Sequence, residues 1–223
     1  MEKFIHDLDW INRQLQDFAA RVAFLIVAKR YQTLKNFNTI PFFERLMDSM
    51  YNTALLIAGI LYDNGRGNLS IYFLLKRVQE LPLLASSRAT PSGVHAIQKK
   101  IKAKKNLVDR VIAPRNKLFA HSDLNWSRRA DFNRNVSNAS PSQYQTVLTQ
   151  HVRDMRTMLP REEELKELLE FTILLMRDIK NLLGAPDTIF SSCRNDREWE
   201  LFYKARVADA EKYFKIVTAH DWR

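Results

Sequence analysis

Apolar residues that recur at alternating spacings of three and four constrain the fold of this chain more than any other feature of its sequence. Such spacing places apolar side chains on one stripe of an α-helix. It is sustained through the first 30 residues, from Pro41 to Leu61 and from Pro160 to Gly184, and no segment shows the alternation that predicts a β-strand. The first of these stripes consists of Phe4, Leu8, Ile11, Leu15, Phe18, Val22 and Leu25. We therefore expect an all-α protein.

Caps, prolines and glycines set the expected limits of the helices. We expect helices over residues 1–30, 41–61, 70–81, 92–121, 160–184 and 196–217, and another that starts after Ser140 and Pro141. Pro114 lies inside the fourth of these segments, and because proline cannot donate the helical hydrogen bond we expect a break there. Residues 124–141 lack periodicity and are rich in Asn and Ser, so they are expected to form a long loop.

Length and composition favour a single helical domain. The chain has 223 residues, of which 46% are hydrophobic and 27% charged, with five glycines and seven prolines. Such a chain can bury a sizeable core, and disordered or turn-rich all-β classes are disfavoured. We expect one domain over residues 1–223, an up-and-down bundle of four to five core helices with additional C-terminal helices. Residues 1–123 would form the bundle core, 124–141 a long basic and polar loop, and 142–223 the C-terminal helices.

Cysteine usage and the N-terminal residues indicate a reducing compartment. Cys193 is the single cysteine and cannot form an internal disulfide. The first ten residues carry acidic side chains where a secretory signal is basic and then apolar. The longest apolar runs, residues 22–28 and 54–62, fall short of the roughly 20 residues that cross a bilayer. We expect a cytoplasmic protein with no membrane association.

The chain carries an excess of positive charge that is concentrated in one region. Its 35 lysines and arginines against 25 acidic residues give a net charge of +10, and most of the excess lies between residues 99 and 134. A basic helix followed by a basic loop is typical of a surface that contacts nucleic-acid phosphates. The alternative is that the lysine run is a solvated helix face. The candidate RNA-binding residues are Lys99, Lys100, Lys102, Lys104, Lys105, Arg110, Lys117, Arg128 and Arg129.

Within this basic region Arg115 precedes His121 by six positions, and the two residue types suit the cleavage of RNA. The guanidinium of arginine holds a phosphate and its developing negative charge, and imidazole exchanges a proton near neutral pH. RNA supplies its own nucleophile in the 2′-hydroxyl, so the reaction needs a base, an acid and charge stabilisation, but no metal. The spacing alone carries little weight, because a chain this rich in arginine matches it by chance.

The same pair of residues favours a homodimer. One histidine per chain is poorly suited to serve as both the base and the leaving-group acid in a single step. On a straight helix, side chains six positions apart also point about 120° away from each other. A two-fold dimer with motif facing motif would supply two histidines and two arginines. The alternative is structural, with Arg115 paired to Asp123 or to a helix C-terminus and His121 capping the helix end.

Two segments of the chain resemble a known family. Residues 115–123, RNKLFAHSD, resemble the signature of the HEPN superfamily (higher eukaryotes and prokaryotes nucleotide-binding) and are most similar to its AbiU-type abortive-infection branch. Residues 42–75 are similar to the apolar second helix of that branch, its Asp-containing turn and the helix start that follows. The resemblance implies a HEPN-like bundle that dimerises through its motif helices and cleaves RNA without a metal. It also implies that Arg115 binds the scissile phosphate, that Asn116 supports it, and that His121 is the acid or base.

Three functions follow from these observations. The first is a metal-independent endoribonuclease that acts on RNA as a homodimer, in the manner of a toxin or antiphage abortive-infection effector. The second is a catalytically silent dimer that binds RNA or a protein partner. The third is an interaction protein whose helices from Pro160 onward recruit a neutralising partner such as a protein antitoxin. We expect no cofactor and no metal, because the histidines and the single cysteine lack the paired spacing of metal ligands.

Overall fold

The described part of the protein is entirely helical. The computed structural model describes residues 2–32, 41–65, 68–80, 91–115, 159–183 and 196–219, together with Ser140 and Gln143. Its helices are α1 (Glu2–Gln32), α2 (Pro41–Leu61), α3 (Ile71–Glu80), α4 (Pro91–Ala103), α5 (Lys105–Arg115), α8 (Glu162–Leu183) and α9 (Asp196–Ala219). Since no strand occurs within these ranges, the predicted all-α fold is confirmed. None of the helices in the same ranges is long and apolar enough to cross a membrane.

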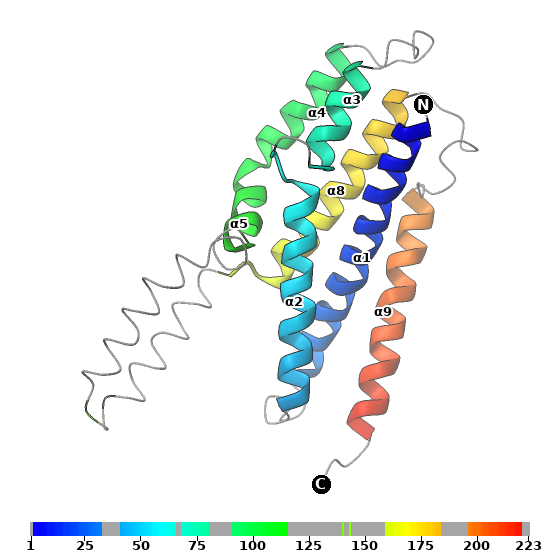
Figure 1. The fold of residues 1–223 in the computed structure, drawn as a ribbon. Coiled ribbons are helices and arrows are strands. Elements are labelled where there is room, and N and C mark those ends of the chain that lie inside the picture. The colour runs from blue at the N-terminus through cyan, green and yellow to red at the C-terminus, as the bar shows by residue number, and fades with distance from the viewer. Residues whose placement is uncertain are drawn as a thin grey trace.

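The helices alternate in direction along the chain. Figure 1 shows α1 running one way, α2 and α3 returning, α4 and α5 descending beside them, α8 running back and α9 descending again. Helix α1 contacts α2, α3, α8 and α9, whereas α5 contacts α2, α4 and α8. The architecture is an up-and-down bundle in which α1 is the central helix.

The predicted apolar stripes form the core. Every residue of the stripe from Phe4 to Leu25 is buried, and burial of one such side chain contributes about 2 kcal/mol. On α8 the buried face includes Leu165, Leu168, Leu169, Thr172, Met176, Ile179, Leu182 and Leu183. Helix α8 belongs to the same hydrophobic cluster as α1 and α2, so this C-terminal helix is part of the bundle core.

A short polar turn joins α2 to α3. The Asp63 carboxylate accepts hydrogen bonds from the Gly65 backbone N–H at 2.8 Å and from the Asn68 side-chain amide at 3.0 Å. A Cβ atom on Gly65 would lie 2.6 Å from Asn68 Nδ2, so a larger residue there would displace the Asn68 side chain from its hydrogen bond to Asp63. At the start of α3 the Ser70 hydroxyl accepts a hydrogen bond from the Phe73 N–H at 3.3 Å. The predicted helix end and the predicted cap are both confirmed.

The structure places a helix break at Lys104, and α5 continues through Pro114 to Arg115, beyond which the chain lies outside the described residues. The buried residues of α4 and α5 follow one stripe at spacings of three and four, and Lys104 occupies the position where this stripe calls for another core residue. Its N–H is shared between the carbonyls of Lys100 and Ile101, which marks the local turn. Lys104 itself is exposed. The buried residues of this stripe are Val94, Ile97, Ile101, Val108 and Val111.

Two further predictions concern residues that the structure describes only in part. The long loop over 124–141 and the helix expected after Ser140 and Pro141 lie outside the described residues, apart from Ser140 and Gln143. The Ser140 N–H donates to Gln143 Oε1 at 3.1 Å, and the Gln143 N–H donates to the Ser140 carbonyl at 2.9 Å. The contact from the Ser140 N–H to the Gln143 side chain is one half of a helix N-terminal capping box.

One buried hydrogen-bonded pair fastens the end of α2 to α8. Tyr62 Oη and Thr172 Oγ1 lie 2.8 Å apart, and Thr172 Oγ1 also lies 2.6 Å from the Leu168 carbonyl oxygen. Because the threonine hydroxyl donates to that carbonyl, the tyrosine hydroxyl must donate to the threonine. Burial raises the pKa of Tyr62, which keeps the phenol in the protonated form that can donate.

We predict that Tyr62 and Thr172 are energetically coupled. Tyr62→Phe removes the donor and should lower the free energy of unfolding by about 1 kcal/mol. Thr172→Val leaves the buried Tyr62 hydroxyl without its acceptor and should lower it by about 1–3 kcal/mol. The double variant should cost less than the sum of the two. Urea denaturation followed by circular dichroism measures all three. Thr53→Val is the matched control, because Thr53 also donates to the carbonyl four residues earlier but on an exposed face. Strictly additive costs would contradict the assigned pairing.

Candidate nucleic-acid interface

The described basic residues of the candidate interface lie on α4 and α5. Helix α4 packs against α3, α5 and α8, and α5 packs against α2 and α8. In Figure 1 the two helices form one edge of the bundle, and α9 lies at the opposite edge beyond α1. In this arrangement some basic residues of α4 and α5 face α8, and others face solvent.

Three of the candidate RNA-binding residues form ion pairs with acidic residues of α8. Lys100 Nζ lies 2.6 Å from Asp178 Oδ2, and Lys104 Nζ lies 2.8 Å from Glu167 Oε1. A third ion pair joins Arg110 to Glu164. Because α8 runs antiparallel to α4 and α5, successive basic residues meet successive acids. Exposed pairs of this kind contribute at most about 1 kcal/mol each, but they partly neutralise the charge that a phosphate would meet.

Lys99 and Lys102 differ from these residues in their surroundings. With His95 and Asn106 they form a stripe of exposed side chains at spacings of four, three and four. The stripe lies on the face opposite the buried residues of α4, and no acidic side chain among the described residues pairs with either lysine. We refer to Lys99 and Lys102 as the outward lysines. Lys105, by contrast, pairs with Asp109 of its own helix.

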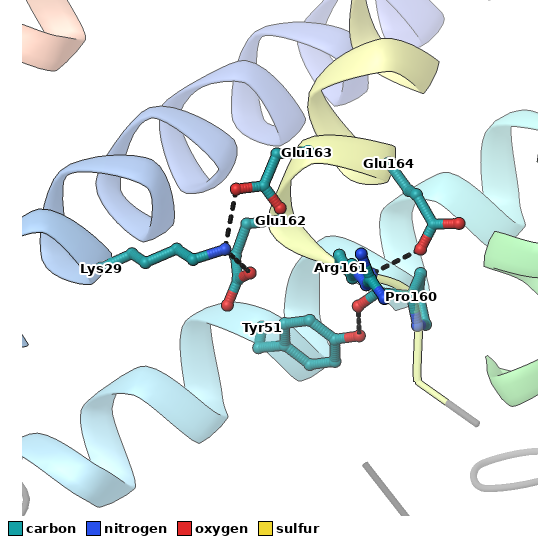
Figure 2. Close-up of polar contacts among 7 residues, drawn as sticks. All are labelled: Lys29, Tyr51, Pro160, Arg161, Glu162, Glu163 and Glu164. Carbon is teal, nitrogen blue, oxygen red and sulfur yellow. Dashed lines mark hydrogen bonds and ion pairs between the residues drawn. The ribbon is translucent and has the colours of Figure 1, made fainter. Parts of the chain in front are cut away.

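Polar contacts at the start of α8 hold three helices together near the end of α5 (Figure 2). The Tyr51 hydroxyl of α2 donates to the Pro160 carbonyl at 2.5 Å. Lys29 of α1 pairs with Glu162 at 3.1 Å and with Glu163 at 2.7 Å. The contacts of this region position the N-terminus of α8 against α1, α2 and, through the Glu164 ion pair, α5.

The first turn of α8 is capped by its own sequence. The Arg161 N–H donates to Glu164 Oε2 at 2.7 Å, and the Glu164 N–H donates to the Arg161 carbonyl at 3.0 Å. The carboxylates of Glu162 and Glu163 also oppose the positive end of the helix dipole. Glu164 thus serves both as the cap of α8 and as the partner of Arg110, so the same residue fixes where α8 begins and where α5 lies.

The electrostatics of the region follow from burial and from these carboxylates. Burial raises the pKa of the Tyr51 phenol, and the negative charges of Glu162 and Glu164 raise it further, while Arg110 acts in the opposite sense. The hydrogen bond to Glu163 raises the pKa of Lys29, and Lys29 in turn lowers the pKa of Glu163. The phenol therefore remains a donor and the lysine a cation at neutral pH.

The structure places only part of the predicted catalytic group. Arg115 is the last residue of α5, so it follows the ion pair at Arg110 by little more than one helical turn. Asn116 and His121 lie outside the described residues, as do the basic residues Lys117, Arg128 and Arg129. The described residues therefore fix the helix that ends in Arg115, and the roles of the three residues stay predictions.

Sequence reasoning missed the acidic partners on α8 and the role of Tyr51. Glu162, Glu163 and Glu164 carry a sequence signal, because acids in a first helical turn are typical of a helix start. Nothing in the sequence indicates that Glu167 and Asp178 meet lysines, since 63 and 78 residues separate the partners. The acidic spacing along α8 becomes interpretable only after α4 and α8 are known to be neighbours.

Two further observations bear on the chemistry of the site. Within the described ranges, no group of three or more His, Cys, Asp or Glu side chains is arranged to hold a metal ion. Comparison of the chain with protein-family models, with curated proteins and with solved structures found no match. A functional assignment therefore has to be argued from the chemistry and geometry of the chain itself.

The raised pKa of Tyr51 leads to a prediction about alkaline pH. Tyr51→Phe removes the hydrogen bond to Pro160 and should lower the free energy of unfolding by about 1 kcal/mol at pH 8. Above pH 10 a tyrosine ionises in the unfolded chain before it ionises in the folded one, so wild type loses stability that the variant does not. The difference between the two proteins should therefore shrink from pH 8 to pH 11, as measured by urea denaturation. A difference that stays constant across this range would contradict the assigned environment.

Proposed function

We propose that the protein binds RNA along α4 and α5 and cleaves it without a metal, as a homodimer of HEPN type. The observation that carries the proposal is that α4 and α5 present the outward lysines and end in Arg115, on a helix pair that is held in place by α8. About 20 Å of helix separates Lys102 from Arg115 at 1.5 Å per residue. The resemblance of residues 115–123 to the HEPN signature supplies the proposed catalytic roles.

In the proposed reaction the 2′-hydroxyl of a ribose attacks the adjacent phosphorus while a base takes its proton. A cyclic phosphate forms, the bond from phosphorus to the 5′-oxygen breaks, and an acid protonates that oxygen. His121 of each protomer supplies one of these two proton transfers. Arg115 holds the phosphate and the charge that develops on its oxygens, and Asn116 supports it. The proposed biological role is that of a toxin or abortive-infection effector, with a neutralising protein partner.

The cleavage test uses total RNA and tRNA in EDTA, read on a denaturing gel. Wild type should cleave, and His121→Ala and Arg115→Ala should each lose at least 100-fold of the rate. His6→Ala is the matched control, because His6 is an exposed histidine on α1 and lies outside the proposed interface on α4 and α5. Gel filtration of each variant checks that its oligomeric state is unchanged. Cleavage that survives both substitutions would refute the proposal.

A binding test separates the outward lysines from those paired with α8. In the His121→Ala background, Lys99→Gln with Lys102→Gln should weaken binding of single-stranded RNA and reduce the salt slope of log K by about 1.4. The matched control, Lys100→Gln with Lys104→Gln, removes the same charge from residues already paired with acids and should change the slope less. Fluorescence anisotropy between 50 and 200 mM salt, roughly the range over which phosphate contacts are resolved, measures both. Equal slopes for the two variants would argue against the outward face as the binding surface.

A second candidate function is the catalytically silent module. The ion pairs with α8 favour it, because they give Lys100, Lys104 and Arg110 a structural role that requires no catalysis. RNA binding that depends on the outward lysines, with no cleavage by wild type in EDTA, would select this candidate.

A further inference from the structure

Two lysines of the candidate interface remain accessible although each is already paired with an acid of α8. The side chains of Lys100 and Lys104 are 57% and 46% exposed, so a ligand from solvent can reach them. We refer to these two residues as the paired lysines. Their partners, Asp178 and Glu167, lie about three helical turns apart and therefore on the same face of α8. Each paired lysine thus already holds an anion of the kind that an RNA phosphate would be.

A carboxylate and a phosphate compete for the same ammonium group. Both are anionic acceptors of charge-assisted hydrogen bonds from lysine. A phosphate that approaches a paired lysine is also repelled by the neighbouring carboxylate, because like charges at close range oppose each other. Ion pairs between exposed side chains are individually weak, so an RNA strand with many phosphates can displace the carboxylates. The displacement lowers the net affinity for RNA.

The third ion pair with α8 differs, because Glu164 has a structural role besides its contact with Arg110. Its carboxylate accepts a hydrogen bond from the Arg161 N–H at 2.7 Å and caps the first turn of α8. Glu164 is therefore held at the helix start even when Arg110 has another ligand. Competition of the kind described above is confined to the paired lysines.

We propose that Glu167 and Asp178 form an autoinhibitory contact, which lowers the affinity of the protein for RNA by occupying the paired lysines. This inference rests on the proposed function, since it takes RNA as the ligand of α4 and α5. Among the described residues no acid pairs with the outward lysines, so a phosphate meets no such competitor there. The binding surface thus has two parts, one that is free and one that binds phosphate only by exchanging its partner.

Neutralising the two acids tests the proposal. In the His121→Ala background, Glu167→Gln with Asp178→Asn should bind a labelled oligouridine strand about fivefold more tightly than the parent protein. The salt slope of log K should also become steeper by as much as about 1.4, because two more lysines then release counterions from the RNA. Fluorescence anisotropy measures both quantities, and unaltered far-ultraviolet circular dichroism shows that the variant is folded.

The matched control removes the same charge from α8 at residues paired elsewhere. Glu163 pairs with Lys29 of α1, and Glu170 pairs with Lys166 of its own helix. Glu163→Gln with Glu170→Gln should change the affinity by less than about twofold, since salt screens exposed charges that do not contact the ligand. An equal gain in both double variants would mean that only the net charge of the protein matters, and would overturn the proposal.

A reversal experiment shows whether the gain depends on the paired lysines. In the variant that lacks both acids, Lys100→Gln with Lys104→Gln should abolish the gain. Substitution of the outward lysines should instead weaken binding by the same factor with or without the acids, because the two effects are independent. A gain that persists without the paired lysines would overturn the proposal.

The same measurements separate this inference from the proposed function. RNA binding that depends on the outward lysines, but is unaffected by Glu167→Gln with Asp178→Asn, would overturn the autoinhibitory contact alone. Absence of RNA binding by the parent protein and by every variant, at each salt concentration, would refute the proposed function and this inference with it.

Discussion

Burial of α1 is the constraint on which the other helices depend. In the second half of this helix the buried residues lie so close in sequence that they face several directions: Phe18, Ala19, Val22, Ala23, Leu25, Val27 and Ala28. A helix that is apolar around most of its circumference must be surrounded. Helices α2, α8 and α9 supply that cover, and the three alanines allow their close approach. Helix α5, which ends in Arg115, depends on α1 indirectly, because α5 packs on α2 and α8.

Most of the fold could be predicted from the sequence, because a helix that buries one face repeats its apolar residues at the helical period. The limits of α2, α3, α8 and α9 follow from this period together with Ser70, Gly65 and the glutamates that begin α8. The break at Lys104 could not be predicted in the same way. No glycine or proline marks it, and it coincides with a single charged residue in an otherwise apolar stripe, which becomes evident only when the buried side of α4 is known.

Of the candidate site, the helix that bears Arg115 was predictable from the sequence. The division of its basic residues into two groups was not. In the sequence, Lys99 and Lys100 are equivalent members of one lysine run, whereas in the bundle they lie about 100° apart around α4. One pairs with Asp178 and the other faces solvent. Charge counted along a sequence therefore overstates the charge available to a ligand whenever an acidic helix packs alongside.

This division has a consequence for how the protein can change over evolutionary time. Substituting Lys100, Lys104 or Arg110 alters an ion pair with α8, so a substitution at these positions favours a compensating substitution in α8. Substituting an outward lysine alters no packing and breaks no ion pair among the described residues. The outer face of α4 is thus the part of the proposed binding surface that can change between lineages while the bundle beneath it stays the same.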